Sequence, residues 1–178
     1  MFVFTPHLFT LAVTISFVLL ASLFYPSRIV ISLWKNKADP GKESVDSIHK
    51  KLGHIMWEYV GMGRTAEGLK KGIAELKAVR KEFETNLFIP GSKEGMNVEL
   101  DKAIRLYDFI TMGELVAYDA LNRNESCGGH FREEYQTEEG EAKRDDENFF
   151  YVACWEYQGD DEKAPVLYKE DVYKRQQS

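Results

Sequence analysis

The sequence predicts a mainly α-helical protein built around a three-helix bundle in residues 35–122. Within that range, apolar side chains recur at steps of three and four residues in three segments, which short stretches containing Gly or Pro separate. Amphipathic helices joined by short loops bury their apolar faces against one another, here most simply as a spectrin-repeat-like bundle. The helical period ends after Asn122, so residues 123–170 are predicted to form a loop and a short β-hairpin-like tail.

The first helix is predicted to follow the turn at residues 39–41, with Ser44 and Asp46 in its polar first turn. The glycines of residues 61–63 end it. The neighbouring Trp57 and Met56 are expected to be packing residues rather than a cofactor-binding pair. The apolar stripe of this helix comprises Val45, Ile48, Leu52, Ile55 with Met56, and Tyr59.

Caps mark the starts of the second and third helices. Thr65 is predicted to cap the second helix, where the charge of Glu67 favours the positive end of the helix dipole. Pro90-Gly91 ends this segment, and Asn97 caps the third helix. The second stripe comprises Leu69, Ile73, Leu76, Val79 with Arg80, Phe83 and Leu87. The third stripe comprises Leu100, Ile104, Tyr107, Ile110 with Thr111, Leu115 and Tyr118.

Two strands are predicted in the tail. The segment NFFYVACWEY, residues 148–157, is aromatic and β-branched with partial alternation. A turn at residues 159–161 follows, and residues 166–168 can return as a second strand. The acidic stretch 133–147 before these strands is interpreted as a solvated face.

Residues 1–34 form an apolar leader. It has no charged side chain before Arg28, and the run of 18 apolar residues from Leu8 to Tyr25 approaches the ~20 residues that span a bilayer. Because Arg28 and Lys35 follow the run, the positive-inside rule predicts a single-pass protein with its C-terminal bulk in the cytoplasm. The alternative is that the leader is an artefact of gene assembly.

The C-terminal end of the sequence supports the interpretation of the leader as an artefact. DVYKRQ, residues 171–176, equals the translation of a transposon-end adapter that is used to prepare sequencing libraries. We therefore expect residues 171–178 to be adapter-derived and the natural sequence to stop near Glu170. For the same reason we interpret the leader as an artefact rather than as a native membrane anchor.

Composition limits the classes of partner. The net charge of −6 argues against a nucleic-acid partner, because no broad basic field is available to displace counterions. Two cysteines, Cys127 and Cys154, are too few for a disulfide framework and are expected to be free thiols. A single disulfide bond between them is the alternative.

The densest cluster of reactive side chains lies in RNESCGGHFR, residues 123–132. A structural zinc site uses four ligands, usually in two close pairs, and Cys127 with His130 forms only one pair. A Cys–His nucleophile needs an orienting third group, and no nucleophile elbow or oxyanion loop is recognisable. Neither phosphate-binding glycine pattern is present. These residue types therefore predict no catalytic, cofactor-binding or metal-binding residue.

The order of residues in this stretch carries a family resemblance. RNESCGGHFR (123–132) and KRDDENF (143–149) resemble the R-x-E-S-R-G-x-H-x-R … RDD signature of succinate dehydrogenase and fumarate reductase flavoprotein subunits, in their C-terminal region, and of the related L-aspartate oxidases. Residues 44–73 look like the start of that family's C-terminal helical domain, and the whole resemblance spans about 35–170. The sequence of these segments most resembles the subgroup found in Bacteroidetes-type bacteria. Cys127 stands where most family members carry Arg.

The resemblance implies an oxidoreductase. Members interconvert succinate and fumarate through FAD and pass electrons to an iron–sulfur subunit and a membrane quinone site. It implies FAD in the intact protein and none in this fragment, which we expect to be inactive alone, because the family's catalytic and FAD-binding residues lie upstream of the matching positions. The expected location is peripheral, on the cytoplasmic face of the bacterial inner membrane, with only indirect contact to the membrane anchor subunit. The direction of the reaction and the quinone type stay open.

In the family, the signature segment packs towards the flavin domain and the partner subunit. We therefore expect it to form an interdomain or subunit clamp through charge-assisted hydrogen bonds. The residues expected in this clamp are Arg123, Glu125, Ser126, His130, Arg132, Arg144 and Asp145. Gly128 and Gly129 are expected to allow close backbone approach. Two other functions remain open: a small membrane-anchored helical scaffold or assembly protein, and the C-terminal part of an L-aspartate oxidase.

Overall fold

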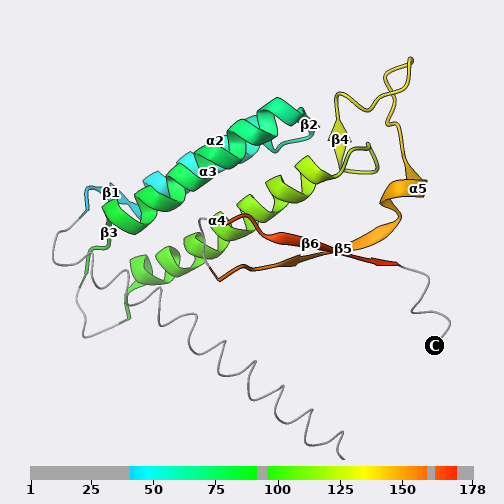
Figure 1. Ribbon diagram of the computed structural model, residues 1–178. Helices are drawn as coiled ribbons and strands as arrows, with labels where there is room; N and C mark the ends of the chain where they lie inside the picture. Colours follow the sequence, from blue (N-terminus) through cyan, green and yellow to red (C-terminus); the bar gives the residue numbers. More distant parts are fainter. Residues whose placement is uncertain (1–40, 92–95, 160–162, 172–178) are drawn as a thin grey trace, which may run out of the picture.

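Three long helices form the centre of the protein, which a computed structural model describes at residues 41–91, 96–159 and 163–171. Figure 1 shows these helices side by side: α2 (Val45–Tyr59), α3 (Ala66–Asn86) and α4 (Val98–Asn122). They are followed by the short helix α5 (Asp146–Phe149) and an antiparallel hairpin of β5 (Tyr151–Glu156) and β6 (Val166–Asp171). The predicted mainly α-helical fold with three amphipathic helices is confirmed.

Both predicted end segments lie largely outside these residues. The expectations for the leader, residues 1–34, and for residues 172–178 of the adapter-like tail therefore stay predictions. Asp171 is described, and it pairs with Tyr151 at the end of the hairpin. In the described part of the chain, no helix is both long and apolar enough to cross a bilayer.

Side-chain caps begin the second and third long helices as predicted. The Thr65 hydroxyl accepts a hydrogen bond of 3.0 Å from the main-chain N–H three residues on. The side-chain oxygen of Asn97 accepts from the N–H groups of Glu99 and Leu100 at 3.0 and 3.1 Å. These bonds satisfy N–H groups that have no partner within a helix, so they fix where each helix starts.

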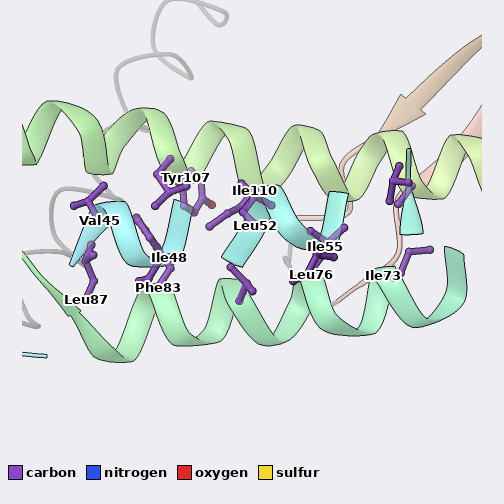
Figure 2. Close-up of a cluster of buried hydrophobic side chains, with 14 of the residues drawn as sticks. Val45, Ile48, Leu52, Ile55, Ile73, Leu76, Phe83, Leu87, Tyr107 and Ile110 are labelled. Carbon is purple, nitrogen blue, oxygen red and sulfur yellow. The ribbon is translucent and has the colours of Figure 1, made fainter. Parts of the chain in front are cut away.

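The hydrophobic core lies where the three helices meet. Figure 2 shows its side chains pointing into the space between them, and each labelled residue is at most 9% exposed. Burying one large apolar side chain stabilises the fold by about 1.5–3 kcal/mol relative to leaving it exposed, so this packing outweighs helix propensity. The labelled residues are Val45, Ile48, Leu52, Ile55, Ile73, Leu76, Phe83, Leu87, Tyr107 and Ile110.

The face that α4 buries differs from its predicted stripe. The predicted residues Ile104, Leu115 and Tyr118 are only partly buried. The buried positions are Ala103, Leu106, Tyr107, Ile110, Gly113, Glu114, Ala117 and Ala120. Small residues let the helices approach closely: a Cβ added at Gly113 would lie 3.1 Å from the sulfur of Met56. A stripe traced through large apolar residues underweights Ala and Gly, and so it points to a neighbouring face.

The prediction that Trp57 packs in the core is wrong, because 83% of this residue is exposed. Its neighbour Met56 does pack against the core. Successive residues of a helix are rotated by about 100°, so a residue beside the stripe can point to solvent.

Two short parallel pairings were not predicted. β1 (Glu43–Ser44) pairs with β3 (Leu87–Phe88), and β2 (Gly63–Arg64) pairs with β4 (Phe131–Arg132). A strand of two residues has no alternation for a sequence pattern to detect. The second pairing joins the α2–α3 turn to the segment that follows α4.

The predicted hairpin is confirmed with shifted bounds. Its first strand begins at Tyr151 rather than at Asn148, because Asn148 lies in α5. The Asp145 carboxylate caps that helix by accepting from the N–H of Asn148 at 3.3 Å. The second strand begins at Val166 as predicted but continues to Asp171.

Candidate functional site

The signature segment forms a loop at the C-terminal end of α4. It leaves the helix at Arg123 and returns beside the α2–α3 turn, where the N–H of Glu133 donates to the carbonyl of Arg64 at 2.8 Å. Figure 1 shows β2 and β4 meeting at this end of the bundle. The hairpin contacts α4 through the bond between Trp155 and Asp119.

Residues 127–130 of the loop make a tight turn. Cys127 and His130 exchange two main-chain hydrogen bonds of 2.8 and 3.0 Å. Gly128 has a φ of +57°, which residues with a side chain rarely adopt. A Cβ at Gly128 or Gly129 would meet no described atom within 4 Å. Gly128 therefore serves the turn, and the close approach of another domain's backbone to these glycines stays a prediction.

Arg132 is 2% exposed and ties the loop to α4. Its Nη1 donates to the carbonyls of Ala120 and Leu121 at 2.9 and 3.3 Å, and these belong to the last turn of the helix, where carbonyls have no helical partner. Its Nε donates to the carboxylate of Glu134 at 3.1 Å. Arg132 thus caps the C-terminus of α4 with charge-assisted bonds.

Glu125, also 2% exposed, joins two parts of the loop. Its carboxylate accepts from Arg123 Nε and from the main-chain N–H of Asp145, each at 2.8 Å. The Ser126 hydroxyl accepts from the N–H of Arg132 at 2.8 Å and donates to the carbonyl of the same residue at 3.0 Å. A buried carboxylate with two donors is well compensated, so this network holds the loop in one conformation.

His130 lies between two arginines. Its Nδ1 is 2.7 Å from Arg64 Nη1, and its Nε2 is 3.0 Å from the carbonyl of Arg123. The assignment that satisfies both contacts is a neutral ring in which Nε2–H donates and Nδ1 accepts. Burial lowers the pKa of His130, the bond to the Arg123 carbonyl raises it, and the charges of Arg64, Arg132 and Arg123 lower it. Both ring nitrogens are engaged, so neither is available to a metal in this arrangement.

Arg144 lies on the outer side of the loop. Its side chain is 57% exposed and pairs with Asp146 at 2.7 Å. The other predicted contact residues bond within the loop, to α4 or to Arg64. The structure therefore ties the loop to itself and to the bundle through the other predicted residues, and Arg144 is the most exposed of the predicted arginines. Whether these residues also contact another domain or subunit stays a prediction.

A pocket of about 540 Å³ opens between α4, the loop and the hairpin. Its polar lining consists of Arg64, Asp119, Arg123, Cys127 and His130. Its other lining residues are Leu115, Val116, Ala120, Ala153 and Trp155. The indole N–H of Trp155 donates to the Asp119 carboxylate at 2.9 Å, which fixes the hairpin against α4 beside the pocket.

Sequence reasoning missed Arg64, Asp119 and Trp155. Arg64 lies 66 residues before His130, and Asp119 lies 36 residues before Trp155. No local spacing links such distant positions. Only the folded arrangement of β2, α4 and the hairpin places them around one pocket.

The pocket combines guanidinium groups, a carboxylate, a thiol and apolar side chains. Within the described ranges, no group of three His, Cys, Asp or Glu side chains could hold a metal ion. His130 is not free to act as a general base for Cys127, because both of its ring nitrogens bond to Arg64 and to the Arg123 carbonyl. What the site offers a ligand is guanidinium donors beside an apolar wall.

Comparison with known proteins places this site in a family. The profile described as fumarate reductase flavoprotein C-term matches residues 49–177. The fumarate reductase flavoprotein subunit of Proteus vulgaris is 33% identical over 132 residues, which make up 74% of this chain and 21% of the relative. A chloroplastic L-aspartate oxidase of Oryza sativa subsp. japonica is 36% identical over 103 residues, 57% of this chain and 15% of the relative.

The fold agrees with that assignment. E. coli quinol fumarate reductase is similar with a TM-score of 0.60 and 25% identity, over 85% of this chain and 25% of that chain. The chain spans 21% and 15% of the length of these two curated relatives. Because the family profile covers most of its residues, the chain belongs to the family of fumarate reductase flavoprotein C-terminal regions.

Proposed function

We propose that this chain is the C-terminal helical region of a succinate dehydrogenase or fumarate reductase flavoprotein subunit, and that its loop is an interdomain clamp. The observation that carries the proposal is the folded signature segment: Glu125 and Arg132, each 2% exposed, bind the loop to itself and to α4. A loop held this firmly presents a preorganised outer surface, which reduces the entropy lost when another domain docks on it.

In the intact subunit we expect FAD to interconvert succinate and fumarate. Electrons then pass to an iron–sulfur subunit and to a membrane quinone site, with the flavoprotein peripheral on the cytoplasmic face of the inner membrane. The similarity to fumarate reductase flavoprotein subunits and to quinol fumarate reductase supports this. The assignment to a Bacteroidetes-type subgroup stays a prediction from the residues of the signature segment.

We expect the described residues alone to bind no flavin. Dinucleotide sites use a strand, a glycine-rich turn and a helix N-terminus that receives the pyrophosphate. In the described part of the chain, β1, β2 and β3 are two residues long and none leads through a Gly-x-Gly-x-x-Gly turn into a helix.

An L-aspartate oxidase is the second candidate, favoured by the 36% identity to the rice enzyme. The two candidates differ in substrate. The full-length protein should oxidise succinate if the first candidate is right and L-aspartate if the second is right. The membrane-anchored scaffold is the third, and it requires that the 178-residue product partition into membranes as a stable native protein.

A chimera tests the main proposal. Residues 49–171 replace the corresponding C-terminal segment of the Proteus vulgaris subunit, and bound FAD and fumarate reduction are measured. We expect the chimera to retain FAD and to reduce fumarate. A folded chimera that lacks both would refute the proposed function.

The clamp is tested in the same chimera with Arg144→Ala. Because Arg144 is exposed and pairs only locally with Asp146 in the described structure, its loss should leave the thermal stability of the 178-residue chain unchanged. We expect it to reduce FAD retention and subunit assembly. Arg105→Ala is the matched control, since Arg105 is 69% exposed and also pairs locally, with Asp101 at 2.9 Å. Equal FAD retention in both variants would exclude an outward clamp at Arg144.

A further inference from the structure

The ring of His130 fastens the turn at residues 127–130 to two other segments. Its Nδ1 lies 2.7 Å from Nη1 of Arg64, which belongs to β2, and its Nε2 lies 3.0 Å from the carbonyl of Arg123, where α4 ends. Arg64 is itself held in place, because its Nε donates to two main-chain carbonyls just after α2 at 3.1 and 2.9 Å. One imidazole thus joins the turn to the α2–α3 connection and to α4.

The tip of this turn has little else to attach it. Cys127 and His130 bond to each other through their main chains, which closes the turn without tying it to another segment. A Cβ on either glycine between them would meet no described atom within 4 Å. The buried Ser126 and Arg132 flank the turn and bond to each other, so they close its base. Within the described chain, the His130 ring is the side chain through which the tip bonds to other segments.

Protonation reverses the contact between His130 and Arg64. In the neutral ring, Nδ1 accepts a hydrogen bond from the guanidinium, whereas in the protonated ring both nitrogens are donors. An arginine side chain has no acceptor and does not deprotonate in proteins. Two donors and two positive charges would then face each other across 2.7 Å. The contact that fastens the turn becomes repulsive.

Positive groups surround the ring on several sides. They come from β2, from the end of α4 and from β4, and they are Arg64, Arg123 and Arg132. Burial lowers the pKa of His130, the bond to the Arg123 carbonyl raises it, and the three positive charges lower it. The neutral, fastened form is therefore the ordinary state of the ring near neutral pH.

The other titratable groups that line the pocket with His130 are Asp119 of α4 and Cys127 of the loop. The hairpin contributes Ala153 and Trp155, which do not titrate. One oxygen of the Asp119 carboxylate accepts the indole N–H of Trp155 at 2.9 Å, and its charge also acts on Arg64. A released Arg64 therefore has an anionic neighbour in the same pocket.

We propose that His130 is a proton-controlled latch: the neutral ring holds the turn at residues 127–130 against the α2–α3 connection, and protonation releases the turn while the bundle stays folded. Opening is confined to the tip, because Ser126 and Arg132 keep the base of the loop closed. Since His130 and Cys127 line the pocket, the latch makes access to the pocket depend on pH. The inference concerns contacts within the described chain and does not rest on the proposed function.

NMR spectroscopy of the 178-residue chain tests the latch. The pH is lowered from about 7.5 while the ring resonances of His130 report its protonation and ¹⁵N relaxation reports backbone order. We expect order parameters of about 0.85 for residues 128–130 with the neutral ring and below about 0.6 once the ring is protonated, while α2 and α3 stay at about 0.85. A protonated ring in a turn that stays rigid would overturn the proposal. Loss of order in the turn and the bundle together would also overturn it.

A variant and a matched control locate the latch. Arg64→Met removes the guanidinium but keeps a long side chain, so the order parameters of the turn should already be below about 0.6 at about pH 7.5. A rigid turn in this variant would show that Arg64 does not hold it. His54→Gln is the control, since His54 is exposed on α2, and release of the turn should occur at the same pH as in the parent chain. A changed pH of release would assign the proton to another group. The titration of the parent chain decides the proposal even if Arg64→Met does not fold.

Discussion

Arg80 and Glu114 are charged residues that lie inside the bundle. They are 5% and 8% exposed, and two bonds of 2.9 and 3.0 Å join the guanidinium to the carboxylate. The hydroxyl of Thr111 accepts a third bond, at 3.2 Å. The desolvation of two charges offsets much of their attraction, so such a pair contributes little to net stability.

Removing one partner should therefore be far more damaging than removing both. Arg80→Ala leaves a buried carboxylate without its cation and should lower the free energy of unfolding by about 3–5 kcal/mol. The double variant Arg80→Met with Glu114→Leu should be close to neutral or stabilising. Urea denaturation followed by circular dichroism measures both. A single variant no less stable than the double one would contradict this account.

The neutral His130 predicts a pH dependence. Its pKa in the folded protein lies below the ordinary 6.5, so as the pH falls past that value the unfolded chain binds a proton before the folded protein does. The stability contributed by neutral His130 is complete above about pH 6.5 and is lost as the pH falls towards the lowered pKa. Melting temperatures at about pH 7.5 and 5.5 should differ more for the parent chain than for His130→Gln. An identical difference in the two proteins would exclude His130 as the titrating group.

At the scale of elements, glycine decides how closely the helices pack. In α3, a Cβ at Gly72 would lie 2.9 Å from Cβ of Tyr59, which is a rigid part of α2. In α2, the exposed Gly53 has nothing within 4 Å of such a Cβ. The same residue type thus serves close packing at one position and has no packing role among the described atoms at the other.

These two glycines should respond oppositely to alanine. Gly53→Ala should stabilise the protein by up to about 1 kcal/mol, because Ala is the better helix former. Gly72→Ala gains the same propensity but forces α2 and α3 apart, and overpacking typically costs about 1–3 kcal/mol, so the net effect should be destabilising. Thermal unfolding of both variants checks this, and stabilisation by Gly72→Ala would show that the two helices yield easily.

At the scale of the whole molecule, the bundle has a large apolar core, whereas the hairpin is attached by few contacts. On the hairpin, Val152 and Tyr168 are 50% and 53% exposed. The indole of Trp155 bonds to Asp119, and Arg123 Nη2 donates to the carbonyl of Phe149 at 2.9 Å. Segments with little buried apolar surface open locally at lower free energy than the core.

Asp119→Ala should therefore loosen the hairpin and not the bundle. A hydrogen bond to a charged group contributes about 1.5–3 kcal/mol, so main-chain amides of β5 and β6 should exchange with deuterium faster in the variant. The amides of α2 and α3 should keep their protection. Faster exchange in all elements together would mean that hairpin and bundle unfold as one unit.

Much of the fold could be predicted because its signals are local. Thr65 and Asn97 cap helices through bonds to residues two or three positions away, and the stripe of α2 follows from one helical period. The face that α4 buries could not be predicted, since it depends on the contact of Gly113 with Met56 of another helix. Among the candidate site residues, the charged types of the loop were recognisable, but their bonding to α4 and to one another was not.

The sequence by itself determined the family, the three helices and the position of the hairpin, because motif order, caps and periodicity are properties of neighbouring residues. Only the tertiary structure decided that Arg132 caps α4 and that Arg64 meets His130 across 66 residues. The physical reason is that charged side chains of a loop have several alternative partners along the chain. Which partner each one takes depends on how the helices dock.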